Sequence, residues 1–379
     1  MLKLRAFLSL ILIFSSSLAL ACEFKEVTFE RDFSGARLNA CEQLSKYEYR
    51  LTIKPENTPI NSSAWYSFKA HAAVPQQIRI TLIYEDGKHR YQPKVSDDGE
   101  HWQLLAHTTK DETASFDLFV SKQPVWVSAQ ELLDVKYMQR WLKTLADKTG
   151  FEAYELGKST QERAIWAIES KAETDDWLIL VGRQHPPEVT GALAMLPFVE
   201  TTLSNLSVAN AFRQRFNILI VPMLNPDGVE LGNWRHNVGG VDLNRDWKDF
   251  KQAETRLVKE KLDSIIAKGG KIRFAVDFHS TWKNLFYTMP VDYGLESPKL
   301  SQTWLDNLAK VLPNFEVDIR PGSSPGRGVF KQYISDTYGV HAVTYEVGDH
   351  ANRNEITIVG KTSALLLMKL LLAEQVAYK

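Results

Sequence analysis

The sequence predicts a three-layer α/β/α domain with a mixed sheet, preceded by a smaller all-β sandwich domain. Up to residue 123, short runs that alternate between apolar and polar residues are separated by polar turns, which is typical of strands with one buried face. After residue 124, apolar runs of strand length alternate with longer helical patterns, which indicates a sheet covered by helices on both faces. The predicted domains are therefore residues 22–123 and 124–379.

Four alternating runs predict the strands of the sandwich. They cover residues 47–53, 64–70, 77–84 and 114–120, with polar turns such as 96–99 between them. The strand pattern gives way near Gln123-Pro124. Beyond it, a capping box over Ser128-Ala-Gln-Glu131 predicts a helix that runs to about residue 148.

The second domain is predicted to alternate strands and helices. Asn225-Pro-Asp-Gly228 is expected to form a turn between two of them. The strand runs are mostly apolar, as strands buried on both faces are. Strands are expected at 164–168, 177–182, 216–221, 274–278 and 342–347, and helices from about 189 and over 253–267, 300–311 and 363–376.

The composition is that of a soluble enzyme. Of the 379 residues, 44% are hydrophobic and 24% are charged, so the chain can bury a large core. The formal net charge of -1 gives no electrostatic reason to expect a nucleic-acid partner. No membrane span is expected after the leader described next.

The first residues predict a signal peptide over residues 1–21. The segment from Met1 to Arg5 is basic, residues 6–14 are apolar, and Ala19-Leu-Ala21 offers a cleavage site before Cys22. The mature protein is therefore expected to be exported. Because the signal is short, a bacterial periplasm is the expected compartment, and a eukaryotic secretory route is the alternative.

The two cysteines, Cys22 and Cys41, agree with export. In an oxidising compartment they form an even pair, so a disulfide that pins the mature N-terminus is expected. The alternative is a lipid anchor at Cys22, which cleavage would leave as the first residue. Against it, Ala19 stands where the usual lipobox has Leu.

Three residues suggest a hydrolytic metal site. His185 and Glu188 enclose two prolines in a loop between a predicted strand and a predicted helix, and His279 ends a later apolar strand. The prolines fix two φ angles, which would hold the imidazole and the carboxylate in one orientation. Two neighbouring ligands and a third supplied by the fold are often how a zinc site with an open position is built. The alternative for His185 and Glu188 alone is a rigid surface turn.

A polar loop after the strand at 216–221 suggests an anion site. It carries Arg235, Asn244 and Arg245 among Gly and Trp residues, a mixture that suits neither a core nor a solvated charge run. Arg presents a fixed fork to a carboxylate, and Asn can donate a hydrogen bond beside it. The alternative for either Arg alone is a surface salt bridge.

Together these motifs resemble the zinc metallocarboxypeptidase family of the carboxypeptidase A type, and its cytosolic-carboxypeptidase-like branch most of all. Their joint occurrence in this order is far more specific than any one of them. A β-sandwich before the catalytic domain is also similar to that branch. The motifs are His-x-x-Glu at 185–188, the Asn-Pro-Asp-Gly to Gly-Val-Asp-Leu-Asn-Arg segment at 225–245, the strand ending in His279-Ser280, and Thr344-Tyr-Glu346-Val-Gly348.

The resemblance implies a metal site at the matching positions. His185, Glu188 and His279 would bind one zinc ion, and water would complete the shell. Asp242 would hydrogen-bond the far nitrogen of His185 and so fix the tautomer of that ligand.

The other matching residues would act on the substrate. Glu346 would be the general base, which takes a proton from water and passes it to the leaving amine. Arg235 would stabilise the oxyanion, and Asn244 and Arg245 would bind the terminal carboxylate of the substrate. The sequence around Glu346 points the same way, because a buried carboxylate in an apolar strand is costly unless a cation lies nearby.

One departure from the family bears on specificity. Digestive members carry a Tyr on a mobile loop upstream of the base, whereas the comparable stretch here, 320–330, has none, and Tyr333 and Tyr338 match the position poorly. Arg327 lies in this stretch, near the expected pocket for the departing residue. It would favour glutamate, aspartate or a diaminopimelate-like group. The alternative is an exposed loop arginine.

Three classes of function are compatible with these residues. The first is a zinc carboxypeptidase that hydrolyses the C-terminal peptide or isopeptide bond of a peptide or a peptidoglycan stem peptide. The second is a zinc deacylase of small N-acyl amino acids, built from the same groups. The third is a binding protein that keeps the pocket. Glu346 argues against the third, because binding alone needs no base.

Overall fold

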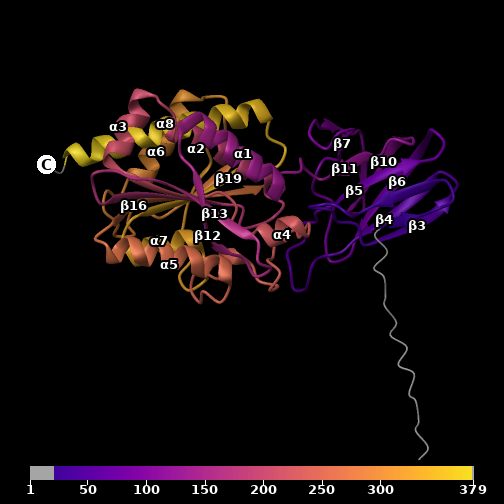
Figure 1. Cartoon of the computed structure of the whole chain (residues 1–379), viewed down its shortest axis with the longest axis horizontal. Coiled ribbons are helices and arrows are strands. Elements are labelled where there is room, and N and C mark those ends of the chain that lie inside the picture. The colour runs from indigo at the N-terminus through magenta and orange to yellow at the C-terminus, as the bar shows by residue number, and fades with distance from the viewer. Residues whose placement is uncertain (1–20, 378–379) are drawn as a thin grey trace, which may run out of the picture.

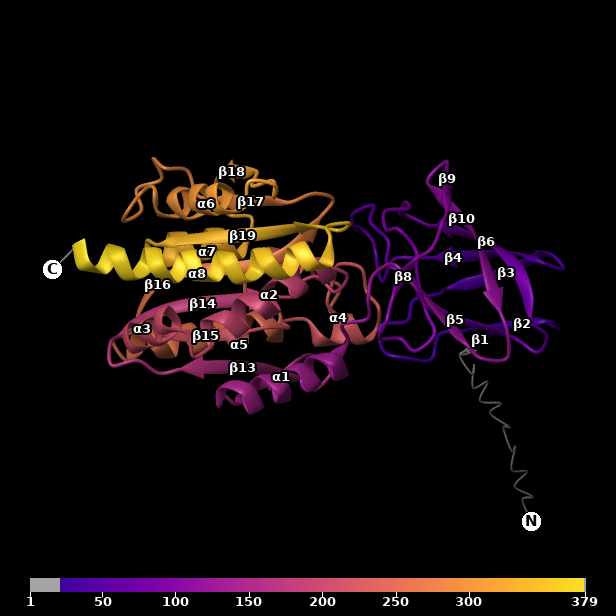
Figure 2. The same cartoon turned by 90° about the horizontal axis from the view of Figure 1, so that it is seen from above.

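The computed structural model describes residues 21–377 and consists of two units that lie next to each other along the long axis (Figure 1, Figure 2). The N-terminal unit is built of strands, and the C-terminal unit is a central sheet between helices. The predicted fold class is confirmed. The predicted signal peptide, residues 1–21, lies outside the described residues except for Ala21.

The N-terminal unit is a β-sandwich. Its strands are β1 Ala21–Glu23, β2 Val27–Glu30, β3 Ala40–Ser45, β4 Glu48–Ile53, β5 Ser67–Ala72, β6 Gln76–Tyr84, β7 Lys94–Ser96, β8 Gln103–Leu104, β9 Thr108–Lys110, β10 Thr113–Val120 and β11 Val125–Ser128. One sheet has the order β1-β2-β5-β11-β7-β8 and the other β3-β4-β6-β10-β9. Tyr49, Phe68 and Phe116 are buried between the two sheets. A Cys22–Cys41 disulfide also links the sheets, as predicted.

The junction between the two units differs from the prediction. β11 pairs with β5 and β7, so the sandwich continues to residue 128, past the expected boundary at 123. The expected capping box does not open a helix. Instead, α1 spans Val135–Thr149, and the Asp134 carboxylate accepts the capping hydrogen bond from Tyr137 N (2.7 Å). Glu131 pairs with Arg353 (2.9 Å), so a long-range partner overrides the local capping pattern.

The C-terminal unit contains an eight-stranded mixed sheet. Its strands are β12 Ala153–Lys158, β13 Ala164–Ser170, β14 Asp176–Gly182, β15 Asn217–Val221, β16 Lys271–Thr281, β17 Leu285–Thr288, β18 Ile319–Pro321 and β19 His341–Gly348. Their order is β12-β13-β15-β14-β16-β19-β17-β18. The central four, β15, β14, β16 and β19, are parallel neighbours. Their carboxyl ends therefore meet at one edge, where open α/β sheets bind ligands.

Helices cover both faces of this sheet and complete three layers. Besides α1 they are α2 Val189–Thr202, α3 Ser207–Arg215, α4 Pro226–Glu230, α5 Ala253–Ala267, α6 Leu300–Val311, α7 Phe330–Tyr338 and α8 Arg353–Ala377. Five helices, α1, α2, α3, α6 and α8, pack on one face, and α5 and α7 pack on the other (Figure 1). α8 is long and apolar enough to cross a membrane, yet it lies along the sheet against α2 and α6.

Two predicted elements differ in extent. Asn225-Pro-Asp-Gly228 does not form an isolated turn, because Asn225 Oδ1 accepts a hydrogen bond from Gly228 N (2.9 Å) and caps the short helix α4. The last helix begins at Arg353 rather than at residue 363. Ile356 and Val359 in its first turns are buried in the core, so tertiary packing extends the helix.

Candidate active site

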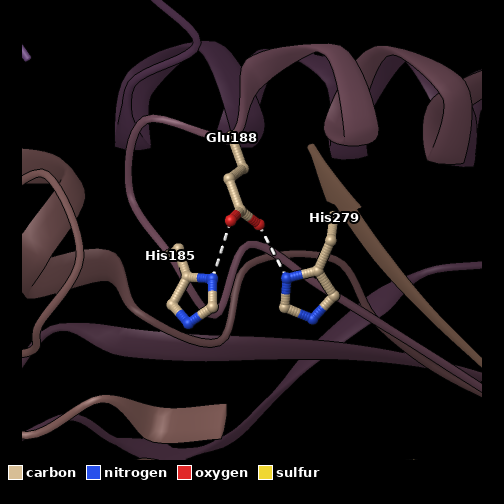
Figure 3. A group of neighbouring side chains, drawn as sticks. All are labelled: His185, Glu188 and His279. Atoms are coloured by element: carbon tan, nitrogen blue, oxygen red, sulfur yellow. Dashed lines mark hydrogen bonds and ion pairs between the residues drawn. The ribbon is translucent and has the colours of Figure 1, made fainter. Parts of the chain in front are cut away.

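His185, Glu188 and His279 meet at the carboxyl edge of the central sheet (Figure 3). His185 lies in the loop after β14, Glu188 directly precedes α2, and His279 lies in β16, the parallel neighbour of β14. One ligand atom from each of the three lies within 4.8 Å of the others. The Nδ1 atoms of both histidines are 2.7 Å from the two carboxylate oxygens of Glu188. The structure thus brings together the three predicted metal ligands.

A carboxylate holds the second nitrogen of each imidazole. His185 Nε2 lies 2.8 Å from Asp242 Oδ1, the predicted partner, and His279 Nε2 lies 2.7 Å from Asp277 Oδ2. Both Nδ1 atoms therefore remain for a metal, and the orientation of each ring is set. Two nitrogens and a carboxylate that converge beside an open cavity fit a catalytic zinc ion.

The electrostatics of this group favour a cation. Burial alone would raise the pKa of Glu188, but the two imidazoles lower it well below its usual range. Burial disfavours the charged form of His279, yet Asp277 and Glu188 raise its pKa well above its usual value. With Asp242 and Glu346, several carboxylates surround two imidazoles, and positive charge is needed to balance them.

Glu346 lies beside the three ligands in β19. It is the ladder partner of His279 across two parallel strands. Its Oε2 atom is buried and has no hydrogen-bond partner among the described residues. Burial raises the pKa of Glu346 to about 7; His279 opposes this shift and Glu188 adds to it. Its position and its pKa are those expected of the predicted base.

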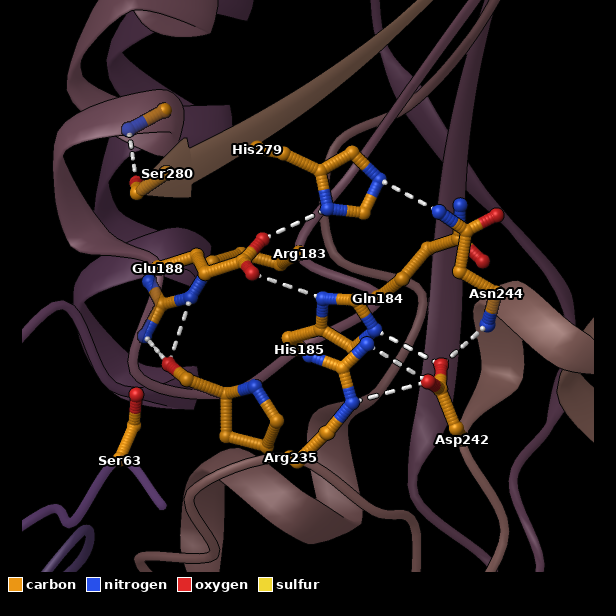
Figure 4. A network of polar contacts seen from close by, with 12 residues as sticks. Ser63, Arg183, Gln184, His185, Glu188, Arg235, Asp242, Asn244, His279 and Ser280 are labelled. Atoms are coloured by element: carbon orange, nitrogen blue, oxygen red, sulfur yellow. Dashed lines mark hydrogen bonds and ion pairs between the residues drawn. The ribbon is translucent and has the colours of Figure 1, made fainter. Parts of the chain in front are cut away.

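Arg235 and Asp242 form an ion pair next to the ligands (Figure 4). Arg235 donates to Asp242 Oδ2 through Nε (2.9 Å) and Nη2 (2.8 Å). Asp242 Oδ1 interacts with His185 and also accepts a hydrogen bond from Asn244 N (2.9 Å). Burial would raise the pKa of Asp242, but His185 and Arg235 lower it below its usual range. Asp242 thus fixes the position of the Arg235 guanidinium and links it to the metal ligand His185.

The predicted carboxylate clamp lies on the same loop, in the single 3-10 turn Leu243–Arg245. Asn244 is already partly engaged, because its Oδ1 accepts a hydrogen bond from Phe330 N (2.9 Å) and its Nδ2 lies 3.4 Å from His279 Nε2. Only Nδ2 can therefore donate to a substrate. Arg245 donates to the Asn244 carbonyl (2.6 Å) and lines the cavity.

A cavity of about 490 Å³ opens in front of the ligands. Arg327 lies on its wall, exposed, and its guanidinium has no hydrogen bond or ion pair within residues 21–377. Two walls come from elsewhere in the chain: Tyr287 from β17, and Asn61 and Arg90 from the sandwich. Tyr333 and Tyr338 do not line the cavity. Their hydroxyls bond each other at 3.0 Å instead.

Several functional neighbours were not predicted from the sequence. Asp277 precedes His279 by two residues, so both side chains point to the same face of β16. The two-residue period of a strand could therefore have identified Asp277 as a neighbour of this ligand. Gln184 donates to Asp277 (2.7 Å) and accepts from Trp247 Nε1 (2.8 Å). No local signal marks Arg90, because its place in the cavity depends on the contact between the two units.

Two family models match the chain. The zinc carboxypeptidase model matches residues 138–352, and the model of the cytosolic carboxypeptidase N-terminal domain matches residues 29–129. Cytosolic carboxypeptidase 6 of Mus musculus is 27% identical over 254 residues, which is 59% of this chain and 46% of the mouse protein. The protein of the same name from Caenorhabditis elegans is 26% identical over 317 residues, 74% of this chain and 69% of that protein. The chain thus matches about half the length of the mouse relative.

Solved structures of bacterial metallo-carboxypeptidases share the fold. The enzyme from Burkholderia cenocepacia superposes with a TM-score of 0.76 at 18% identity, covering 91% of this chain and 99% of that one. The enzyme from Pseudomonas aeruginosa gives a TM-score of 0.73 at 20% identity, covering 90% and 98%. The resemblance seen in the motifs is confirmed by the family model, which spans more than half of the chain and includes every predicted ligand. The chain belongs to the zinc carboxypeptidase family.

Proposed function

We propose that the protein is a one-zinc metallocarboxypeptidase that removes an acidic or diaminopimelate-like residue from the C-terminus of peptides in the periplasm. The observation that carries the preference is an excess of positive charge in the active-site cavity. Its wall contains only two carboxylates, Glu188 and Glu346, among the described residues. The cations that face them are Arg90, Arg235, Arg245, Arg320, Arg327 and Lys331.

Three of these cations have an acidic partner within hydrogen-bond distance. Arg90 pairs with Asp349, Arg235 with Asp242, and Arg320 with Asp318.

The other three, Arg245, Arg327 and Lys331, can balance negative charge on a substrate. Arg245 lies 4.0 Å from Asp242, beyond hydrogen-bond distance. Lys331 is buried, its Nζ donates to the Thr288 carbonyl (3.1 Å), and burial lowers its pKa to about 8. The terminal carboxylate of a substrate would engage one of these cations. A second acidic group, on the side chain of the last residue, would then match the positive charge of the other two.

The residues of the chain divide the reaction between them. His185, Glu188 and His279 would hold the zinc ion, which when bound would act as a Lewis acid and lower the pKa of water towards about 7. Arg245 and the Asn244 amide hold the terminal carboxylate. Glu346 takes a proton from water and returns it to the leaving amine. Arg235 donates to the carbonyl oxygen as that oxygen gains negative charge.

The Cys22–Cys41 disulfide supports an exported protein, because such bonds persist in oxidising compartments. In this arrangement the Cys22 sulphur is bonded to Cys41, which favours the disulfide over a lipid anchor on the same atom. Peptidoglycan stem peptides are available in the periplasm and carry diaminopimelate. They are therefore the first natural substrates to examine.

The test compares peptides that differ only in the last residue: glutamate, aspartate, diaminopimelate or leucine. Zinc-loaded protein is incubated with each peptide, and the loss of one residue is followed by mass spectrometry. We expect kcat/KM to be highest for the acidic endings. Arg327→Ala should reduce the preference for glutamate over leucine about tenfold, as loss of one charged contact predicts.

Arg140→Ala is the matched control, because Arg140 is also exposed but lies on α1, outside the cavity. An unchanged preference in the Arg327 variant would refute the role of that residue. If no peptide is shortened while small N-acyl amino acids are hydrolysed, the protein is the alternative deacylase.

A further inference from the structure

Glu56 of the sandwich binds three consecutive backbone amides of the catalytic unit. Its Oε2 accepts a hydrogen bond from Trp234 N (3.1 Å). Its Oε1 accepts from Arg235 N (3.0 Å) and from His236 N (2.7 Å). One carboxylate from a distant part of the chain thus satisfies three donors of the loop that carries Arg235. Hydrogen bonds from backbone N–H groups to a charged acceptor are among the stronger ones in proteins.

The next residue of the sandwich extends this contact. Asn57 Oδ1 lies 2.9 Å from His236 Nδ1, and Asn57 Nδ2 donates to the Gly240 carbonyl (3.4 Å). On the other side, Gly232 approaches the sandwich so closely that a Cβ atom there would lie 2.5 Å from the Ala36 carbonyl oxygen. The loop is therefore held against the sandwich on both sides of Arg235.

The segment held in this way reaches the metal ligands in two steps. The Arg235 guanidinium donates twice to Asp242, and Asp242 holds Nε2 of His185. A rotation of the Arg235 backbone would move the guanidinium. This would weaken the contact between Arg235 and Asp242 and, through Asp242, the contact with His185. In a loop, no helix or strand ladder fixes this backbone, so its orientation depends on the partners of its amides.

We propose that Glu56 is a positioning residue for Arg235, through which the sandwich sets the geometry of catalysis in the neighbouring unit. Glu56 acts on the backbone of the loop and does not touch the substrate. The inference rests on the proposed role of Arg235 as the group that stabilises the oxyanion. It gives the N-terminal unit a part in the chemistry, in addition to the cavity wall formed by Asn61 and Arg90.

The test is Glu56→Gln, which keeps the size of the side chain but replaces one acceptor oxygen by a donor that opposes Trp234 N. Gln has nearly the same size as Glu, and Glu56 borders a crevice of about 480 Å³ between the two units. The change therefore introduces no packing defect. Glu42→Gln is the matched control, because Glu42 is exposed and pairs with Arg50 within the sandwich. Melting temperatures of both variants establish that they are folded.

Three measurements are made on the full chain. Hydrogen exchange of the amides of residues 234–236 should accelerate at least tenfold in Glu56→Gln and should not change in Glu42→Gln. The value of kcat should fall about tenfold with KM nearly unchanged, less than the 10²- to 10³-fold typical for removal of an oxyanion donor itself. Zinc content should stay the same.

A double-mutant cycle separates positioning from a general structural role. If Glu56 acts through Arg235, adding Glu56→Gln to Arg235→Ala should change kcat less than twofold. Losses that multiply instead would overturn the proposal, and so would unchanged amide exchange in Glu56→Gln. If the wild-type protein shortens no peptide, the proposed function fails, whereas the exchange experiment still decides whether Glu56 holds the loop.

Discussion

Asp277 fixes the ring of His279 from within the same strand. It is fully buried, and its Oδ2 lies 2.7 Å from His279 Nε2 and accepts a hydrogen bond from Gln184 (2.7 Å). Its other oxygen has no partner among the described residues. The buried Asp277 carboxylate makes the His279 imidazole a better metal ligand, because it stabilises the positive charge that the ring acquires when it binds the metal.

We expect Asp277→Asn to weaken zinc binding by about 10- to 100-fold, the range typical for such outer partners. Asn can still accept from His279 and Gln184 through one oxygen, but it lacks the charge and places its amide group where the unpartnered oxygen of Asp277 lies. Competition with a coloured chelator measures the affinity. Asp263→Asn is the control, since Asp263 is exposed on α5 and pairs with Lys259. Equal affinities in the two variants would contradict the role of Asp277.

Glu346 should make the stability of the zinc-free protein depend on pH. Burial raises its pKa to about 7 in the folded state, above its ordinary value of 4.5. The folded state therefore holds the proton more tightly than the unfolded state. The stabilisation is fully present below about pH 4.5 and is lost as pH rises through about 7, on the order of 3 kcal/mol in total.

The check is urea unfolding of zinc-free wild-type protein and of Glu346→Gln at several pH values. The free energy of unfolding of the wild type should fall relative to that of Glu346→Gln from about pH 4.5 to pH 7, and the difference should then level off. A difference that does not vary with pH would show that the carboxyl group is not shielded from water.

The contact between α2 and β16 sets the distance between the two ligand-bearing elements. Gly191 lies in the first turn of α2, and a Cβ atom there would be 2.3 Å from the His279 carbonyl oxygen. Ser280 Oγ accepts a hydrogen bond from Gly191 N (2.7 Å), which holds the helix start on the strand. Only glycine permits this approach, and it brings Glu188 and His279 to one point.

Gly191→Ala should therefore push α2 away from β16. We expect a loss of about 1–3 kcal/mol in stability, as for other overpacked sites, together with at least tenfold weaker zinc binding. Chemical denaturation and chelator competition measure the two effects. Thr201→Ala, near the other end of α2, should lower stability through the lost bond to the Pro197 carbonyl but leave zinc affinity unchanged. Tight zinc binding in Gly191→Ala would show that the site tolerates the displacement.

The two units share one hydrophobic cluster. Trp234 is 2% exposed and packs, with Val189 and Ala192 of the catalytic unit, into the core of the sandwich. Charged contacts surround this cluster, among them Arg90 with Asp349 (2.7 Å). An interface that continues both cores should make the two units unfold together.

We expect wild-type protein to show a single calorimetric transition. Trp234→Ala removes one of the two tryptophans of the shared cluster, which should cost about 3–5 kcal/mol and separate the transition into two. Trp282→Ala is the control, because Trp282 is 69% exposed. Two transitions already present in the wild type would show that the units are energetically independent.

The sequence by itself determined the class of the fold, the order of the two units and the residues that could form the metal site. Periodicity and turn residues are local properties, and His185-Pro-Pro-Glu188 combines two ligands with the prolines that orient them. The tertiary structure decided which distant groups complete the site. Asp277, Glu56 and Arg90 take their roles from strand register and from the contact between units, which bring together residues far apart in the chain. The same long-range contacts overrode local signals at Glu131, because a partly buried ion-pair partner outweighs a capping preference of about 1 kcal/mol.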